Sequence, residues 1–175
     1  SDHAAELAPA MRPKGAEITG TLAGWTDAVK AAFASGVLQW QVGALAGFVS
    51  PIIDLCGLPS RMLAYTGPPG RGKSTAHMLQ NSAWGDATPK RGLCGSFDVT
   101  AGAPEVLLAR ASGAGCSFDE AHLIKGTEFQ TFMYKVASDA GRDRMTTDAT
   151  GLRDTRAWRL FVTLSSEQSV AAKIR

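Results

Sequence analysis

Residues 67–74 read Gly-Pro-Pro-Gly-Arg-Gly-Lys-Ser and directly follow the apolar run Met62-Leu63-Ala64-Tyr65. This spacing is that of a Walker A phosphate loop between a strand and a helix. Glycines let successive backbone N–H groups point into one concavity at a helix N-terminus, where they cradle phosphates. The residues expected to bind a nucleoside triphosphate are Gly67, Pro68, Pro69, Gly70, Arg71, Gly72, Lys73, Ser74 and Thr75.

The last three of these residues have distinct expected roles. Lys73 reaches the β- and γ-phosphates as a point charge, and Ser74 supplies a hydroxyl ligand for Mg²⁺. Thr75 adds a contact to the α-phosphate. The cofactors predicted from the loop are therefore ATP and Mg²⁺.

Length and composition favour one globular domain. The chain has 175 residues, of which 45% are hydrophobic, and a formal net charge of +2. This charge is too small to indicate a nucleic-acid partner by itself, so such a contact would need locally clustered Lys and Arg. The three cysteines are far apart and lack zinc-ligand spacing, which favours reduced thiols in the core of a cytosolic protein.

Residues 1–20, with Pro9 and Pro13, are expected to be a linker or the tail of an upstream domain, and residues 21–175 an ATPase core without a C-terminal lid. Residues 37–58 are apolar, but Pro51 and Asp54 favour a buried helix or helix pair over a membrane span. We find no signal-peptide pattern, so we expect no membrane association and a cytoplasmic location.

Hydrophobic spacing predicts alternating helices and strands. A first helix starts after Thr21, which caps it, and ends at Gly36. Helices are also expected at 37–58, 73–84, 105–111 and 127–137, and strands at 61–66, 95–99, 115–118 and 158–164. This alternation predicts an α/β fold with a parallel, doubly wound sheet flanked by helices and preceded by an N-terminal helical segment.

A second acidic element follows in Cys116-Ser117-Phe118-Asp119-Glu120, although this strand is only weakly hydrophobic. Asp119 is expected to hold the Mg²⁺ hydration shell, while Glu120 orients and deprotonates the attacking water. The alternative is an ordinary solvated acidic pair at a strand end.

The final strand ends in small hydroxyl residues, which can sense the γ-phosphate. We favour Ser165, with Thr163 and Ser166 as close alternatives, and a plain strand-terminating turn also fits. His122 is either a coupling residue between nucleotide and a neighbouring loop or a packing residue.

A locally basic segment runs from Asp139 to Arg159 and includes Arg142 and Arg144. Arginine recognises phosphates in a planar bidentate manner, so one of these residues fits a finger across a subunit interface or a contact to a nucleic-acid backbone. A solvated turn with compensating charges is the alternative.

Several motifs together resemble a known family. They are Gly24-Trp25, the phosphate loop, Trp84-Gly85, the Phe97 to Glu105 segment, Asp119-Glu120, Gly141-Arg142 and Trp158-Arg159-Leu160. In these residues the chain is similar to a bacterial and phage ATPase domain that carries a "domain of unknown function" label. That domain occurs in prophage and mobile-element proteins, often behind a primase-like region, and its relatives include MCM-like helicases.

The resemblance implies a P-loop NTPase fold of the AAA+/ASCE type that assembles as a homo-oligomeric ring, expected to be a hexamer, with an arginine supplied in trans. It also implies movement on single-stranded or forked DNA and a primase-like domain or partner. The leading hypothesis is an ATP-hydrolysing DNA helicase or translocase core in phage or mobile-element replication. The alternative is a non-translocating ATPase switch that controls assembly with a partner protein. A small-molecule kinase is disfavoured because Glu120 would waste ATP on water.

Overall fold

The sheet has four parallel strands, β1 (Arg61–Thr66), β2 (Cys94–Ser96), β3 (Cys116–Asp119) and β4 (Phe161–Ser166), in the order β1-β4-β3-β2. This computed structural model describes residues 19–88, 93–97, 103–141 and 155–173. The prediction of an α/β fold with a parallel sheet is confirmed. Strand β4 comes last in the chain but pairs with both β1 and β3, so the carboxyl ends of these three strands lie side by side.

The described residues contain six α-helices: α1 (Leu22–Ala34), α2 (Leu38–Ala46), α3 (Val49–Leu55), α4 (Lys73–Ser82), α5 (Ala103–Arg110) and α6 (Gly126–Ala137). The predicted cap of the first helix is confirmed, because the Thr21 hydroxyl accepts a hydrogen bond from Gly24 N–H at 3.1 Å. The long apolar stretch forms the helix pair α2 and α3. Within the described ranges, no helix combines the length and apolar character needed to cross a membrane. A short 3-10 helix, η2 (Val170–Lys173), was not predicted.

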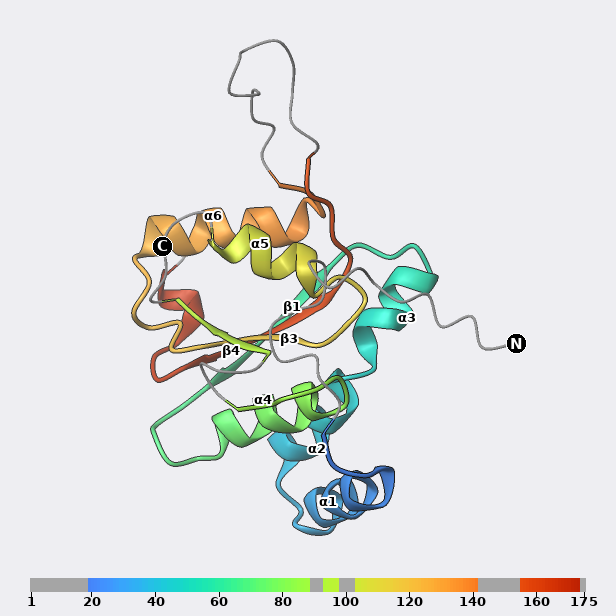
Figure 1. The fold of residues 1–175 in the computed structure, drawn as a ribbon. Helices are drawn as coiled ribbons and strands as arrows, with labels where there is room; N and C mark the ends of the chain where they lie inside the picture. The colour runs from blue at the N-terminus through green and yellow to red at the C-terminus, as the bar shows by residue number, and fades with distance from the viewer. Residues whose placement is uncertain (1–18, 89–92, 98–102, 142–154, 174–175) are drawn as a thin grey trace, which may run out of the picture.

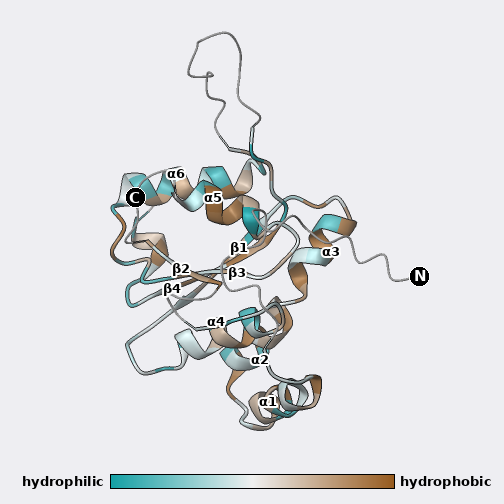
Figure 2. Cartoon of the chain, in the orientation of Figure 1, coloured by the Kyte–Doolittle hydropathy of each residue, from teal (hydrophilic) through white to brown (hydrophobic). Residues whose placement is uncertain are grey.

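The helices lie on both sides of the sheet, as expected for a doubly wound fold. Figure 1 shows α5 and α6 on one side and α4 on the other, with α2 and then α1 beyond α4. In Figure 2 hydrophilic residues appear on α6, whereas α5 is largely hydrophobic. The N-terminal helices therefore form an additional layer that packs on α4.

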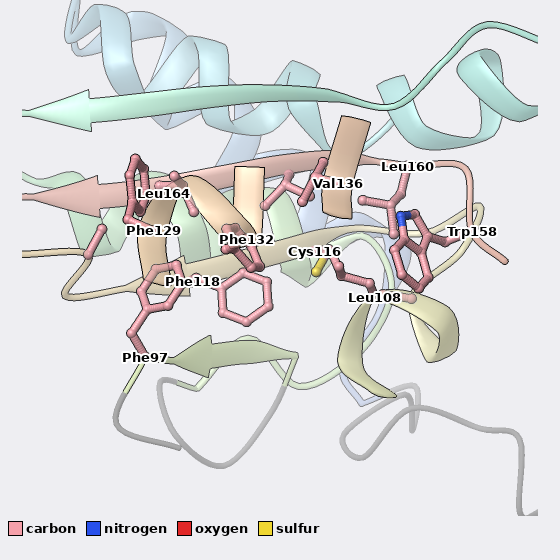
Figure 3. Close-up of a cluster of buried hydrophobic side chains, with 13 residues drawn as sticks. Phe97, Leu108, Cys116, Phe118, Phe129, Phe132, Val136, Trp158, Leu160 and Leu164 are labelled. Atoms are coloured by element: carbon pink, nitrogen blue, oxygen red, sulfur yellow. The ribbon is translucent and has the colours of Figure 1, made fainter. Parts of the chain in front are cut away.

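The main hydrophobic core lies between the sheet and the pair α5–α6 (Figure 3). Phe129, Phe132 and Val136 lie on one side of α6 and are buried. Phe132 packs edge-on against Phe118 of β3, with ring centroids 5.1 Å apart. Burying each such side chain contributes roughly 1.5–3 kcal/mol, so this face supplies much of the stability.

The opposite face of the sheet is polar. Ser117 and Asp119 alternate with apolar residues along β3, and Thr163 and Ser165 do the same along β4. Helix α4 packs against this face. Side chains that would be solvated on an ordinary strand are therefore enclosed beneath this helix.

Buried polar side chains of α4 form hydrogen bonds with the polar residues on this face of the sheet. Asn81 Nδ2 donates to Ser117 Oγ at 2.7 Å, which explains why the β3 segment is only weakly hydrophobic. Thr163 Oγ1 donates to Gln80 Oε1 at 2.5 Å and lies 2.9 Å from His77 Nδ1. Buried polar groups are stable only with such partners. These contacts form a hydrogen-bonded polar layer between α4 and the sheet.

Strand β4 begins at Phe161, later than the predicted start at Trp158. The N–H groups of Arg159, Leu160 and Phe161 donate to the hydroxyls of Ser112, Ser60 and Ser50 at 2.9, 3.1 and 2.8 Å, respectively. Because these N–H groups donate to serine hydroxyls, they are not available for the backbone hydrogen bonds that would extend the strand towards Trp158. At its other end β4 extends to Ser166, because Ser165 and Ser166 pair with Tyr65 and Thr66.

The cysteines differ in their environments. Cys94 and Cys116 are buried, as expected, whereas Cys56 is exposed and is not a core residue. Burial raises the pKa of the Cys116 thiol to about 12 and that of Cys94 to about 11. Both buried thiols therefore stay protonated at neutral pH and act as small apolar residues.

Candidate functional site

The glycine-rich loop, residues 67–72, connects β1 to α4. The backbone φ values of Gly67, Gly70 and Gly72 are 147°, 74° and 80°, which residues other than glycine rarely adopt. Gly72 is the N-cap of α4, so the free N–H groups and the positive end of that helix face the space beyond the loop. This geometry suits an anion.

Lys73, the first residue of α4, turns back over the loop. Its Nζ donates to the carbonyl oxygens of Gly67 at 2.6 Å and Pro68 at 2.8 Å. A positive charge is thereby held beside the backbone donors of the loop. Both features attract the same negatively charged groups.

A cavity of about 740 Å³ opens at the carboxyl ends of β3 and β4. Its walls include residues 69–75, together with Val37, Gln39, Trp40, Asp119, Glu120, His122, Ser165, Ser166 and Glu167. A cavity of this size is within the range that holds small molecules and cofactors. Tertiary structure therefore brings the glycine-rich loop, the acidic pair and the end of the last strand to one site.

Asp119, at the end of β3, is the centre of the hydrogen bonds in this cavity. Its Oδ2 accepts from Ser74 Oγ at 3.3 Å. Its Oδ1 accepts from the Ser165 hydroxyl and from Glu120 N–H, the latter at 3.0 Å. One carboxylate thus joins α4, β3 and β4.

Glu120 follows Asp119 in a left-handed backbone conformation, with φ of 62°. This conformation is uncommon for a residue other than glycine, asparagine or aspartate. Its N–H also lies 3.2 Å from Ser165 Oγ, and the next residue, Ala121, donates to the Ser165 carbonyl at 2.8 Å. These contacts hold the backbone turn that brings Glu120 to the cavity wall.

The three candidate hydroxyls of the last strand have different surroundings. Ser165 donates to Asp119 at the cavity. Thr163 lies deeper, in the polar layer with His77 and Gln80. Ser166 also lines the cavity, and its hydroxyl accepts from Gln168 N–H at 3.2 Å. Ser165 therefore bonds both residues of the acidic pair, through the Asp119 carboxylate and the Glu120 N–H.

His122 lines the cavity, and its carbonyl accepts a hydrogen bond from Lys173 Nζ at 2.8 Å. The same Nζ donates to Ile124 O at 2.6 Å, so η2 fastens the segment that follows Glu120. Arg142 and Arg144, the candidate finger residues, lie outside the described residues.

Sequence reasoning missed Gln39 and Trp40 as cavity residues. Nothing in a helical apolar stretch indicates contact with a loop more than thirty positions away. The polar layer beneath α4 did leave a signal, because His77, Gln80 and Asn81 lie on the same helical face as Lys73. Burial lowers the pKa of His77 to about 4, with Asp119 opposing this effect, so the ring is neutral at pH 7.

The family described as "Domain of unknown function (DUF927)" matches residues 5–156. The chain belongs to this family. No curated protein matches the chain.

A solved structure of a helicase shares the fold of this DUF927 chain. The structure described as "SCCmec type IV Cch - active helicase" aligns with 93% of the chain at a TM-score of 0.69 and 23% identity. NtrX from Brucella abortus, in complex with ATP, aligns with 75% of the chain at a TM-score of 0.44 and 15% identity. The chain spans 29% of the first protein and 32% of the second. The first likeness shows a shared fold, whereas the TM-score of the second is too low to carry an argument.

Proposed function

We propose that this chain is the ATP-binding and ATP-hydrolysing core of a DNA helicase or translocase that acts in phage or mobile-element replication. The observation that carries the proposal is the contact of Ser74 and Ser165 with Asp119 at a cavity that begins at the glycine-rich loop. The fold shared with a helicase of 23% identity supports the same interpretation. The phosphates of ATP would bind at residues 67–75, which form the Walker A loop of an AAA+/ASCE-type P-loop domain.

The oxygen groups in the cavity fit Mg²⁺. Ser74 contributes a hydroxyl and Asp119 a carboxylate, and these are the hard ligands that Mg²⁺ prefers. The described residues contain no cluster of three or more His, Cys, Asp or Glu side chains, so a protein-only metal cage is not built there. One or two protein ligands plus substrate phosphates is the usual arrangement for Mg²⁺ in such sites. When bound, the ion would neutralise charge on the phosphates.

Glu120 is the proposed base for hydrolysis. It lines the cavity beside Asp119, where its carboxylate would accept a proton from the attacking water. Ser165 would report the state of the γ-phosphate through its hydrogen bond to Asp119. Lys73 would bind the β- and γ-phosphates, because its ammonium is already held beside the loop.

Ring assembly and DNA binding are further parts of the proposal. A hexameric ring would place an arginine of one subunit, Arg142 or Arg144, at the site of the next. An arginine finger contributes about 10³ to 10⁵ in turnover. Arg142→Ala or Arg144→Ala should therefore lower ATPase activity on that scale if one is the finger, and a change near twofold would remove both from this role.

The competing proposal is a non-translocating switch whose nucleotide state controls assembly with a partner, such as a primase-like domain. The deciding experiment measures ATP hydrolysis with no DNA, single-stranded DNA and forked DNA, with Glu120→Gln as the blank. DNA-stimulated turnover that the variant lacks supports the motor. Turnover that DNA leaves unchanged favours the switch, and absence of ATP binding rejects both.

A further inference from the structure

Two side chains in the first turn of α2 hold carbonyl oxygens of the glycine-rich loop. Gln39 Nε2 donates to Arg71 O at 2.6 Å, and Trp40 Nε1 donates to Gly72 O at 3.2 Å. Both residues also line the 740 Å³ cavity. The roles proposed for Lys73, Ser74 and the acidic pair do not account for these contacts.

The fit between Trp40 and the loop is close. A Cβ on Gly72 would overlap the indole nitrogen of Trp40, and the φ of 80° at this position also favours glycine. The Gly72 carbonyl accepts a second hydrogen bond from Ala76 N–H at 3.1 Å. The last peptide unit of the loop is therefore held by both α2 and α4.

Helix α2 lies very close to α4, because the two meet at glycines. A Cβ on Gly43 would lie 2.5 Å from Ala76 O, and one on Gly47 would lie 2.7 Å from Gln80 O. Trp84 Nε1 donates to Gly47 O at 2.6 Å. The contacts of Trp40, Gly43 and Gly47 are each about one helical turn apart. Helices α2 and α4 therefore form one closely packed pair.

Because a peptide unit is planar and trans, the contacts to these carbonyl oxygens also determine where the N–H groups on the opposite edge of the loop point. In such a unit the C=O of one residue and the N–H of the next point in opposite directions. Holding Arg71 O fixes the direction of Gly72 N–H, and holding Gly72 O fixes that of Lys73 N–H. A flipped peptide would present a carbonyl oxygen where an anion needs a donor.

We propose that Gln39 and Trp40 are positioning residues for phosphate recognition, which keep the Gly72 and Lys73 N–H groups turned towards the cavity. This inference rests on the proposed function, since it assumes that the loop binds the phosphates of a nucleotide. Neither side chain needs to touch the reacting atoms. Their contribution is to hold the loop in its binding shape before the ligand arrives.

The test compares Trp40→Phe and Gln39→Met with Trp25→Phe. Trp25 is a matched control, because its Nε1 donates to Ser82 Oγ at 3.0 Å in the same helical layer but its side chain lines a different cavity. We expect Mg-ATP affinity about three- to tenfold weaker in Trp40→Phe and in Gln39→Met, the effect of losing one hydrogen bond, and unchanged in Trp25→Phe. In Trp40→Phe and Gln39→Met the KM for ATP should rise by a larger factor than kcat falls, whereas Trp25→Phe should change neither.

A spectroscopic measurement separates positioning from general packing. The chain has 4 tryptophans, and the indole N–H signals of Trp40 and Trp25 can be assigned in ¹H–¹⁵N spectra as the ones that disappear in Trp40→Phe and in Trp25→Phe. Mg-ATP should move the Trp40 signal and leave the Trp25 signal in place. A Trp40 signal that does not respond to bound ATP overturns the inference.

The affinity measurements also separate the two proposals. If the wild type binds ATP and both Trp40→Phe and Gln39→Met bind it equally well, the inference alone is wrong. If the wild type binds no ATP, the proposed function fails and the inference fails with it. Gln39→Met keeps the test informative if Trp40→Phe does not fold, because Gln39 is only partly buried.

Discussion

The Ser74 hydroxyl lies 3.3 Å from Oδ2 of Asp119 and donates a hydrogen bond to it, across 45 positions of sequence. Ser74 belongs to the first turn of α4, whereas Asp119 ends β3. The contact exists because α4 packs across the polar face of the sheet and its N-terminus meets the carboxyl ends of the strands. The two residues that we propose as ligands of Mg²⁺ are thus already neighbours.

Lys73→Ala should abolish ATP binding or turnover, because it removes the ammonium group that the carbonyl oxygens of Gly67 and Pro68 hold beside the glycine-rich loop. Charge-assisted hydrogen bonds contribute about 1.5–3 kcal/mol each, so at least a tenfold loss of affinity is expected by calorimetry. Lys30→Ala is the control, since Lys30 lies on α1 with an exposed side chain. Near-normal binding by Lys73→Ala would reject the phosphate role.

Glu120→Gln should bind ATP with nearly normal affinity but fail to hydrolyse it, because an amide cannot accept the proton of the attacking water. Binding is measured by calorimetry and turnover by phosphate release. Glu128→Gln, on an exposed position of α6, is the matched substitution away from the cavity. Normal hydrolysis by Glu120→Gln would show that another group is the base.

Ser165→Ala should lower turnover by about tenfold and change ATP affinity less, since it removes a hydrogen bond to the Asp119 carboxylate and an acceptor for Glu120 N–H. Ser166→Ala is the comparison, because its hydroxyl contacts Gln168 N–H instead. Steady-state kcat and KM, measured for both variants, test whether turnover falls more than ATP affinity in Ser165→Ala alone. Equal effects of the two substitutions would contradict a special role for Ser165.

His77 makes stability depend on pH. Burial lowers its pKa to about 4 in the folded chain from the ordinary value of 6.5, so the unfolded chain binds more protons between these values. The stabilisation is present above about pH 6.5 and is lost as the pH falls towards 4. The two pKa values correspond to roughly 3 kcal/mol.

His77→Asn should therefore flatten the fall in stability between pH 6.5 and 4, because asparagine does not titrate and its amide can still donate to Thr163. Urea unfolding at several pH values measures the slope. The slope, rather than the absolute stability, is compared, since the smaller side chain also loses packing. An equal slope in the variant would mean that His77 is not the titrating group.

Gly43→Ala should destabilise the chain by about 1–3 kcal/mol, because its Cβ would lie 2.5 Å from the Ala76 carbonyl oxygen. In an open helix the same change would stabilise by about 1 kcal/mol. Gly24→Ala in α1 is the control, since its Cβ meets only Thr21 Oγ1, at 3.3 Å. Denaturant unfolding that finds Gly43→Ala as stable as wild type would contradict the close packing of α2 on α4.

Local patterns in the sequence were enough for most of the secondary structure. Strand β1 has its predicted bounds, and α6 differs by one residue, because a strand before a glycine-rich turn and an amphipathic helix both have strong local signals. The start of β4 could not be predicted. It depends on serine hydroxyls from three other parts of the chain, which bond the N–H groups of the first strand residue and of the two residues before it.

By itself, the sequence determined the glycine-rich loop, the acidic pair and the parallel α/β class, since each depends on residue types at short spacing. Only the tertiary structure decided which groups meet. The position of β4 between β1 and β3 brings Ser165 to Asp119, and the packing of α2 on α4 brings Gln39 and Trp40 to the loop. Long-range hydrogen bonds of this kind form because packing brings distant segments into register, and no local pattern records them.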